Sequence, residues 1–286
     1  MKFSELSPED KTMLWDYRVS IVEIEKTFAK SSIKEMFYRL NLTNYSLNSQ
    51  EKLNSQESAF GEASEALSKL DFWELSRVFS ASDARRMLDV RYCCSIYILA
   101  NEGVVDQTGG KKINDYYLDY ADEFDDDKVL YQKIESAMDI ISELNDKSTQ
   151  SFVSKKAQMY TLFCMSLKML DDGIIMTPEL IERFKAFVKA YNCFRNVYNI
   201  NFSNDQLRKA NEEISKYKLA SSEGTNKLAN RVIRLETIFR ICVEGDHEVV
   251  SQMKDLENLY KSQAEHDRND ADVFDIEDKA DIHEIE

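Results

Sequence analysis

The chain has 286 residues, enough to bury one large core or two modest ones without disulfides or bound metals. It contains only 7 Gly and 2 Pro, fewer than strands joined by tight turns require, so helices joined by polar loops are favoured. The formal net charge of -15 argues against a grip on DNA that relies on general neutralisation of the phosphate backbone.

The cysteines and the apolar segments indicate in which cellular compartment the protein is expected. The five cysteines lie inside apolar helical stretches, at spacings that suit neither zinc ligands nor a secreted disulfide framework. We therefore expect buried, reduced thiols in a cytoplasmic protein. Residues 1–10 lack the basic start and apolar centre of a signal peptide, and no apolar run approaches the length of a membrane span.

The N-terminal region combines helix and strand signals. Ser7 can cap a helix that has Pro8 at its first position. Residues 19–25 alternate in polarity and are rich in β-branched side chains, which predicts a strand. Because a lone strand leaves its backbone groups unpaired, we expect it to pair with something outside this sequence or to pack as an extended arm. Ser32 can then cap a helix over residues 33–40.

The stretch from Phe79 to Ala100 is predicted to be the central helix. Ser80 can cap its first turn, and Gly103 supplies a stop. Its apolar side chains occupy more than one stripe, so other helices must surround it. Amphipathic segments are expected before and after it, over residues 47–54, 60–73, 113–120, 129–144, 155–170, 178–199, 205–217 and 227–244, with helix starts marked at Thr177-Pro178-Glu179 and Ser203-Asn204-Asp205.

These elements predict a mainly α protein, a multi-helix bundle with a short N-terminal β element. We assign residues 1–28 to a short helix and an orphan strand, residues 29–263 to a helical domain, and residues 264–286 to an acidic, disordered tail. The tail alternates acids with sparse apolar residues and has no helical or strand period.

The sequence contains no recognisable motif for catalysis or metal binding. The three histidines lie near the C-terminal end without metal-ligand spacing, and Gly109-Gly110 lacks the context of a phosphate-binding loop. Acid pairs such as Asp171-Asp172 are typical of solvated loops. The sequence therefore predicts no metal site and no cofactor held by this chain alone, and it favours a protein that is not itself an enzyme.

One polar cluster is predicted at the turn between the helices expected over residues 33–40 and 47–54. Its members are Arg39, Asn41, Asn48, Gln50, Glu51 and Asn54. Two interpretations stay open: the cluster satisfies itself, with Arg39 paired to Glu51, or it forms a polar lip that faces a ligand or partner. Arg85 and Arg86, at the start of the central helix, are further candidates, although surface salt bridges would also account for them.

Several short segments follow one another in an order and spacing that point to one family. They are Met36-Phe37-Tyr38-Arg39-Leu40-Asn41, Leu47, Gln50-Glu51, Asn54, Phe72-Trp73, Phe79-Ser80, Asp83, Arg86-Met87, Asp89-Val90, Lys111-Lys112-Ile113, Tyr116-Tyr117, Ser222-Glu223-Gly224-Thr225-Asn226-Lys227, Asn230-Arg231 and Arg234. Together they resemble the GmrSD family, bacterial modification-dependent restriction and anti-phage proteins whose N-terminal half is ParB/sulfiredoxin-like. The resemblance covers most of residues 1–244.

The resemblance does not extend to the parts of the family that carry its chemistry. The nucleotide-hydrolysing or DNA-processing centre of the family is associated with an Asp-Gly-Gln-Gln-Arg motif, which this sequence lacks, as it lacks a C-terminal His-Asn-His nuclease module. The chain thus looks like the helical half of such a protein. The resemblance implies that residues 19–25 close the sheet of a ParB-like half, and that a nucleotide is bound only with that half. The seam between the halves would be lined by Arg39, Asn41, Gln50 and Glu51.

Three functions follow as hypotheses. The first is a non-catalytic helical subunit or fragment of a bacterial anti-phage or restriction system, which binds or regulates a ParB-like or nuclease partner. Such a subunit reaches nucleic acid through the complex and does not contact a membrane. The second is a stand-alone enzyme acting on a nucleotide or on modified DNA. The third is an acidic inhibitor whose surface imitates DNA phosphates.

Overall fold

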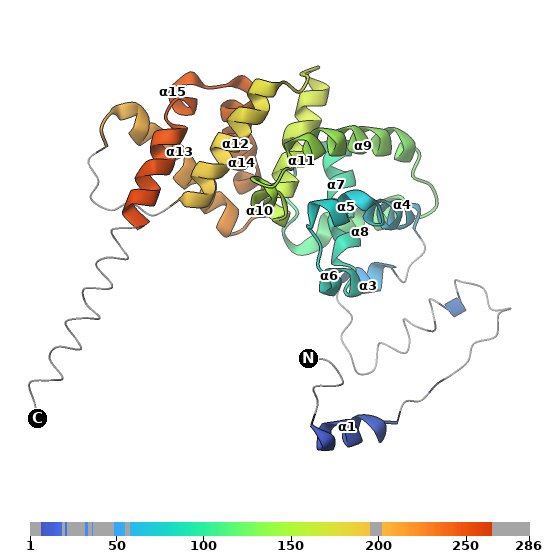
Figure 1. Cartoon of the computed structure of the whole chain (residues 1–286). Coiled ribbons are helices and arrows are strands. Elements are labelled where there is room, and N and C mark those ends of the chain that lie inside the picture. The colour runs from blue at the N-terminus through green and yellow to red at the C-terminus, as the bar shows by residue number, and fades with distance from the viewer. Residues whose placement is uncertain are drawn as a thin grey trace, which may run out of the picture. The chain divides into compact units, whose positions relative to one another are not determined.

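The computed structural model describes residues 7–18, 21, 32, 33, 36, 49–54, 58–194 and 202–264. The chain divides into two compact units, Met1–Tyr45 and Ser46–Glu286. The described residues form helices and turns, with no strand among them (Figure 1). The mainly α fold is confirmed. The strand predicted over residues 19–25 lies outside the described residues, apart from Ile21, which is exposed. The domain boundary predicted after residue 28 and the tail beyond residue 264 also lie outside them.

The first unit contains α1 (Pro8–Trp15), and the second contains the remaining elements. In chain order the second unit has α3 (Ser49–Asn54), α4 (Ala59–Ser68), α5 (Asp71–Ser76), α6 (Ala81–Arg85), α7 (Leu88–Glu102), the 3-10 turn η2 (Thr108–Gly110), α8 (Lys111–Asp119), α9 (Asp127–Leu144), α10 (Gln150–Val153), α11 (Lys156–Asp171), α12 (Pro178–Cys193), α13 (Asp205–Ser222), α14 (Leu228–Ile238), the π-helix η3 (Phe239–Glu244) and α15 (His247–Val250). Residues 253–264 add a last helical stretch.

Helix starts follow the capping signals of the sequence. The Ser7 hydroxyl accepts a hydrogen bond from the Asp10 backbone N–H at 3.1 Å and begins α1. Thr177 caps α12 in the same way, and Asn204 caps α13 by accepting from the Leu207 N–H at 2.7 Å. The helix starts predicted at these positions are confirmed, because a cap depends only on residues three apart in sequence.

Two of the predicted helices are each divided in two. The segment over residues 60–73 is interrupted between α4 and α5, and the central helix is interrupted between α6 and α7. Met87 lies at the second break with a φ of 52°, a left-handed conformation that ends one helix before the next begins. No residue of α6 is buried, so the apolar packing that sustains the central helix starts only with α7.

Helix α7 is buried as the sequence predicts. It buries Val90, both vicinal cysteines and the run from Ile96 to Ala100. Gly103 ends it with a φ of 77°, which only glycine adopts readily, and its N–H donates to the Leu99 carbonyl at 2.9 Å. Of the five cysteines, four are buried and Cys193 is half-buried, and none forms a disulfide.

Helix α11 is a second central helix, which the sequence predicted only as an ordinary amphipathic segment. Every residue from Gln158 to Leu167 is buried. Figure 1 shows α11 between the helices α4–α9 on one side and α12–α15 on the other, and it packs against α7, α9, α10 and α14. Its polar side chains find partners inside: Gln158 donates to the Tyr191 hydroxyl at 2.9 Å and accepts from the Tyr217 hydroxyl at 2.5 Å.

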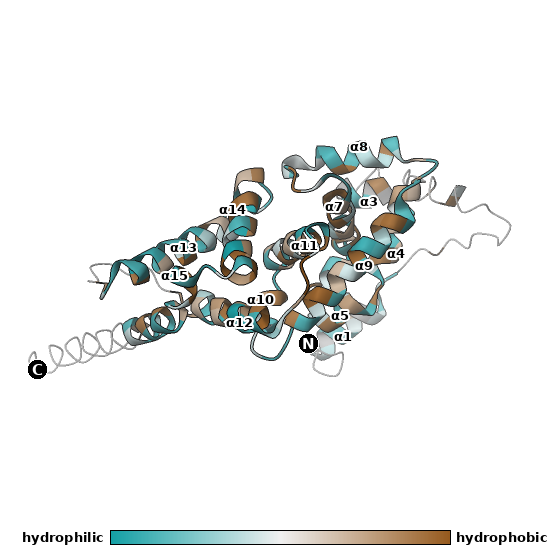
Figure 2. Ribbon diagram, turned by 90° about the horizontal axis from the view of Figure 1, so that it is seen from above, coloured by the Kyte–Doolittle hydropathy of each residue, from teal (hydrophilic) through white to brown (hydrophobic). Residues whose placement is uncertain are grey.

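Three clusters of aromatic rings fill the described core, and the one around Trp73 joins Phe72, Phe79 and Tyr92 to Phe163 of α11. The other two lie around Phe60 and Phe152. The cluster around Phe60 contains Tyr97, Tyr116, Tyr117 and Phe124, with ring centroids 5.1–6.3 Å apart. The cluster around Phe152 contains Phe184, Phe187, Tyr191 and Tyr217. Figure 2 shows α7 largely in hydrophobic colours and α13 largely in hydrophilic ones. None of the helices in the described ranges combines the length and apolarity needed to cross a membrane.

Candidate functional site

The polar turn predicted as a partner seam is described only in part. Arg39, Asn41 and Asn48 lie outside the described residues, and nothing is described of the side chain of Asn54, the last residue of α3. The seam therefore stays a prediction. Its position in the sequence falls close to the boundary between the two compact units.

Two members of that turn make contacts inside the second unit. The buried Gln50 donates through Nε2 to the Tyr117 hydroxyl at 2.9 Å, which ties α3 to α8. Glu51 Oε1 forms an ion pair with Arg86 Nε at 3.4 Å, which joins α3 to the residue after α6. Arg86 thus forms an ion pair of the kind that the salt-bridge interpretation describes. Arg85 lies exposed in the last turn of α6, and the pairing of Arg39 with Glu51 stays a prediction.

A different site lies where α7, α11 and the start of α14 meet. A cavity of about 270 Å³ opens there. It is lined by Leu88, Arg91, Tyr92, Ser95, Lys156, Ala157, Tyr160, Thr225, Asn226, Arg231 and Arg234. Four of these side chains are cationic and none is acidic, in a chain whose formal net charge is -15. We call this site the arginine pocket.

Each helix presents one face to the arginine pocket. Leu88, Arg91 and Ser95 of α7 are three and four residues apart, so they lie on one side of that helix. From α11 come Tyr160 and the first two residues of the helix, Lys156 and Ala157. A helix begins with N–H groups that have no acceptor within the helix, and Lys155, the residue before α11, supplies no side-chain cap. The positive end of the α11 dipole therefore lies at the pocket.

Arg231 is buried, with 3% of its surface exposed. Its Nη1 donates to the Val105 carbonyl at 2.8 Å and to the Tyr160 hydroxyl at 3.0 Å, and its Nη2 donates to Gln107 Oε1 at 3.1 Å. Its guanidinium carbon lies 4.0 Å from the centre of the Tyr160 ring. Its Nε has no acceptor among the described residues, and neither has Nε2 of the buried Gln107.

Arg234 is more deeply buried, at 1% exposure, and all three of its nitrogens are used. Nε donates to Thr161 Oγ1 at 2.9 Å, Nη1 to the Ala220 carbonyl at 2.6 Å, and Nη2 to the Thr225 carbonyl at 2.9 Å. These bonds join α14 to α11, to the last turn of α13 and to the loop before α14. Arg234 therefore holds the pocket wall together, whereas Arg231 retains a donor.

Neither guanidinium forms an ion pair with any described residue, although both interact with neutral acids. Burial raises the pKa of the Tyr160 hydroxyl and raises the pKa of the Cys164 thiol to about 12, even though the two arginines act to lower both. Both groups are therefore protonated at neutral pH. Burial also lowers the pKa of Arg234 from its usual value of 12.5, which leaves the group charged. Neither buried guanidinium is thus neutralised by an ion pair with a described residue.

Lys156 has a carboxylate partner at the rim. Its Nζ pairs with Asp83 Oδ1 at 2.5 Å, and 41% of its side chain is exposed. Asp83 also belongs to the capping box of α6, where it accepts from the Ser80 backbone N–H at 2.9 Å. Burial acts to raise the pKa of Asp83, but the hydrogen bonds from Lys156 and Ser80 outweigh it and lower the pKa to about 2. The Asp83 carboxylate is therefore ionised at neutral pH.

The arginine pocket was not predicted from the sequence, although the residue pattern of α14 and η3 indicates buried arginines. On α14 and η3 the buried residues Arg231, Arg234, Ile238 and Ile241 are three or four apart and form one helix face. Arginine thus occupies two positions of this face at which an amphipathic helix usually has an apolar residue. Arginine is rarely buried unless its guanidinium has partners, so arginines at apolar positions of a helix indicate a buried polar site.

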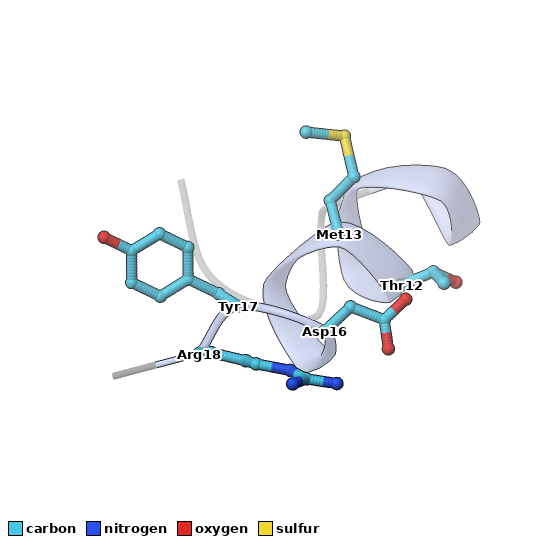
Figure 3. Close-up of a pocket in the computed structure, with 5 residues that line it drawn as sticks. All are labelled: Thr12, Met13, Asp16, Tyr17 and Arg18. Carbon is cyan, nitrogen blue, oxygen red and sulfur yellow. The ribbon is translucent and has the colours of Figure 1, made fainter. Parts of the chain in front are cut away.

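Two other hollows lack this convergence of charge. One of about 700 Å³ lies on α1 and is lined by Thr12, Met13, Asp16, Tyr17 and Arg18. Figure 3 shows Met13 and Tyr17 pointing in different directions at this hollow, which lies on α1 and the residues just after it, and both side chains are about three-quarters exposed. The other lies between α12 and residues 253–264, where both lysines and glutamates line the wall. Neither gathers side chains of one sign around a common centre.

The residues in the described ranges contain no group of three or more His, Cys, Asp or Glu side chains that could hold a metal ion. Comparison with models of protein families, with curated proteins and with solved structures finds no match to this chain. The function is therefore inferred from the arginine pocket and from the sequence resemblance.

Proposed function

We propose that this chain is a helical binding subunit that holds an anionic ligand in the arginine pocket. The observation that supports this is the lining of the cavity, which includes four cationic side chains and no acidic one, with the buried Arg231 guanidinium among them. Among the described residues Arg231 has no carboxylate that forms an ion pair with it, and cationic groups that converge on one cavity favour an anion there.

The ionisable groups of the arginine pocket support binding rather than proton transfer. Arginine stays charged at all physiological pH values, and burial keeps Tyr160 protonated by raising its pKa. The rim carboxylate of Asp83, with a pKa of about 2, stays ionised. No member of this set changes its charge near neutral pH, which suits a subunit that recognises a fixed negative charge.

Calorimetric titration with pyrophosphate tests this proposal. Lys156→Gln removes a pocket cation, and we expect it to weaken binding about tenfold, because a charge-assisted hydrogen bond contributes about 1.5 kcal/mol or more. Lys168→Gln is a matched control: Lys168 lies in the same helix, is 44% exposed and pairs with Asp172 at 2.7 Å, but lies outside the pocket. It should leave the affinity unchanged.

Either of two results would overturn the proposal. One is the absence of measurable heat when millimolar pyrophosphate is added to the folded wild-type chain. The other is an equal loss of affinity in Lys156→Gln and Lys168→Gln, which would show that pyrophosphate responds only to total charge.

We further propose that the binding subunit works in a bacterial anti-phage or restriction system, in the cytoplasm, beside a ParB-like or nuclease partner. The support for this is the resemblance of the ordered segments from Met36 to Arg234 to the GmrSD family. Co-expression with a ParB-like or nuclease protein encoded beside this chain should give a complex that purifies as one species. Replacing Ile21, Val22 and Ile24 by proline should abolish that complex, since proline removes the backbone donors of a strand edge. A chain that elutes alone beside each such protein would contradict this part.

A further inference from the structure

Asp83 places a carboxylate of the chain itself at the rim of the arginine pocket. Its Oδ1 lies 2.5 Å from Nζ of Lys156, which lines the cavity. The Asp83 side chain is 16% exposed, although no residue of α6 is fully buried. If the arginine pocket binds an anion, as proposed above, that anion and Asp83 are attracted to the same ammonium.

The two negative groups would lie too close together to share Lys156 at no cost. A charge-assisted hydrogen bond to an ammonium is about 2.8 Å long, so an anion bound to Lys156 would lie no more than about 5 Å from Asp83 Oδ1. Like charges at that separation repel each other, and water screens the repulsion less in a partly buried site. Binding of the anion is therefore favoured when Asp83 moves away.

The segment that carries Asp83 is attached to the core at its two ends. Phe79 precedes it and packs against Trp73 and Tyr92, with ring centroids 5.0 Å and 5.5 Å away. Met87 follows it with a φ of 52° and lies directly before α7. None of residues 80–86 between these two ends is buried. We call residues 80–86 the α6 strap.

Ion pairs join the α6 strap to other helices. Asp83 pairs with Lys156 of α11, and Arg86 pairs with Glu51 of α3. The other carboxylate oxygen of Asp83, Oδ2, accepts from the Ser80 backbone N–H at 2.9 Å and from the Ser80 hydroxyl at 2.7 Å. These two bonds lie within the strap and can move with it. Loss of the pair with Lys156 would thus separate Asp83 from α11 without removing any buried side chain of the strap from the core.

We propose that Asp83 is a built-in competitor of the ligand, and that an anion entering the arginine pocket displaces it from Lys156 and loosens the α6 strap. Without an anion, the pair neutralises the ammonium of Lys156. With an anion bound to Lys156, the Asp83 carboxylate turns to solvent and stays ionised there. The α6 strap therefore couples occupancy of the pocket to a change on the outer surface of the second unit.

Removing the charge of Asp83 tests the competition. In calorimetric titration at neutral pH, Asp83→Asn should bind pyrophosphate about tenfold more tightly than the wild-type chain, because a repulsive charge close to the anion is gone. Asp172→Asn is the matched control: Asp172 pairs with Lys168 at 2.7 Å at the other end of α11 and lies outside the pocket. It removes the same charge and should leave the affinity unchanged.

Hydrogen exchange of the wild-type chain is a second measurement, which keeps the test decisive if Asp83→Asn fails to fold. Saturating pyrophosphate should speed exchange of the amides of the α6 strap at least about threefold, because a less tightly held segment opens more often. Exchange in the rest of the second unit should not become faster.

Two results would overturn the inference while anion binding stands. One is an affinity of Asp83→Asn equal to or below that of the wild-type chain, and the other is exchange of the α6 strap that is unchanged or slower with pyrophosphate. Failure of the wild-type chain to bind pyrophosphate would overturn the proposed function as well.

Discussion

At the scale of single residues, the structure depends on side chains that occupy unusual conformations or environments. Arg231 and Arg234 occupy an apolar helix face because backbone carbonyls and hydroxyls take up most of their donors. Arg77 and Met87 are the non-glycine residues with positive φ among those described, and each lies at the end of a helix. Both kinds of feature can be tested by single substitutions.

Replacing Arg77 by glycine should stabilise the second unit. Arg77 ends α5 with a φ of 56°, and its side chain is exposed. A left-handed conformation costs a residue with a side chain roughly 1 kcal/mol, and glycine avoids most of that cost. We expect Arg77→Gly to raise the free energy of unfolding in urea by about 0.5–1 kcal/mol. The control Glu62→Gly, in the helical conformation of α4, should lower it by about 1 kcal/mol.

Replacing Asp83 by asparagine should destabilise the protein in a pH-dependent way. The pKa of Asp83 in the folded protein is about 2, below its usual 3.8. The ionised carboxylate therefore stabilises the fold above about pH 4, and this contribution is lost as the pH falls toward 2. We expect Asp83→Asn to lower the free energy of unfolding by about 1 kcal/mol at pH 7. The difference from wild type should shrink steadily between pH 4 and pH 2.5, and a constant difference would contradict the assignment.

The sequence indicates the buried arginines of the arginine pocket but not the groups that surround them. The helical period of residues 227–244 is visible in the sequence, and it places Arg231 and Arg234 on the face of Ile238. What the period does not contain is the set of acceptors: Val105, Thr161 and Ala220 come from distant parts of the chain. The sequence of one helix is enough to recognise a buried arginine. Its hydrogen-bond acceptors can be identified only when the packing of the neighbouring segments is known.

At the scale of helices, the sequence predicted where helices start but not where they are interrupted. Ser7, Thr177 and Asn204 cap the helices predicted to start there, because a capping bond spans three residues. The breaks at Leu70 and Met87 carry no glycine or proline, so the apolar period continues through them unmarked. These breaks are set by how α4, α5 and α7 pack together, which sequence periodicity does not report.

Gly61 tests the closest approach between two of these helices. It lies in α4, where alanine would ordinarily be the better helix former by about 1 kcal/mol. A Cβ at this position would lie 2.7 Å from Tyr117 Cε1 on α8, so the ring must move. We expect Gly61→Ala to lower the free energy of unfolding by about 1–3 kcal/mol, as overpacking does.

A second substitution shows whether the ring is responsible. In Gly61→Ala combined with Tyr117→Leu the contact is relieved, so the two losses should not add, and the interaction energy should favour the double variant by about 1 kcal/mol. Additive losses, or a stabilising Gly61→Ala, would show that Tyr117 does not restrict this position.

At the scale of the whole molecule, the described core of the second unit is one cluster with members from Leu53 to Tyr260. Thiol labelling should report its integrity. Burial raises the pKa of Cys94 to about 11 and that of Cys164 to about 12, which suppresses the reactive thiolate. In native buffer we expect a maleimide to modify Cys193 alone, and mass spectrometry should find all five sites only in urea. Rapid native labelling of Cys164 would show that the core opens far more readily than its packing indicates.

The enclosure of α11 has a consequence for how the protein responds to its ligand. The first turn of this helix lines the arginine pocket, while Gln158 bonds to Tyr191 and Tyr217 and Phe163 packs against Trp73 in the core. Melting that core would release α11 and destroy the pocket with it, so occupancy and folding are thermodynamically linked. A ligand present at a hundred times its dissociation constant should add about 2.7 kcal/mol to the stability of the native state. The melting temperature can therefore serve as a readout in a search for the natural ligand.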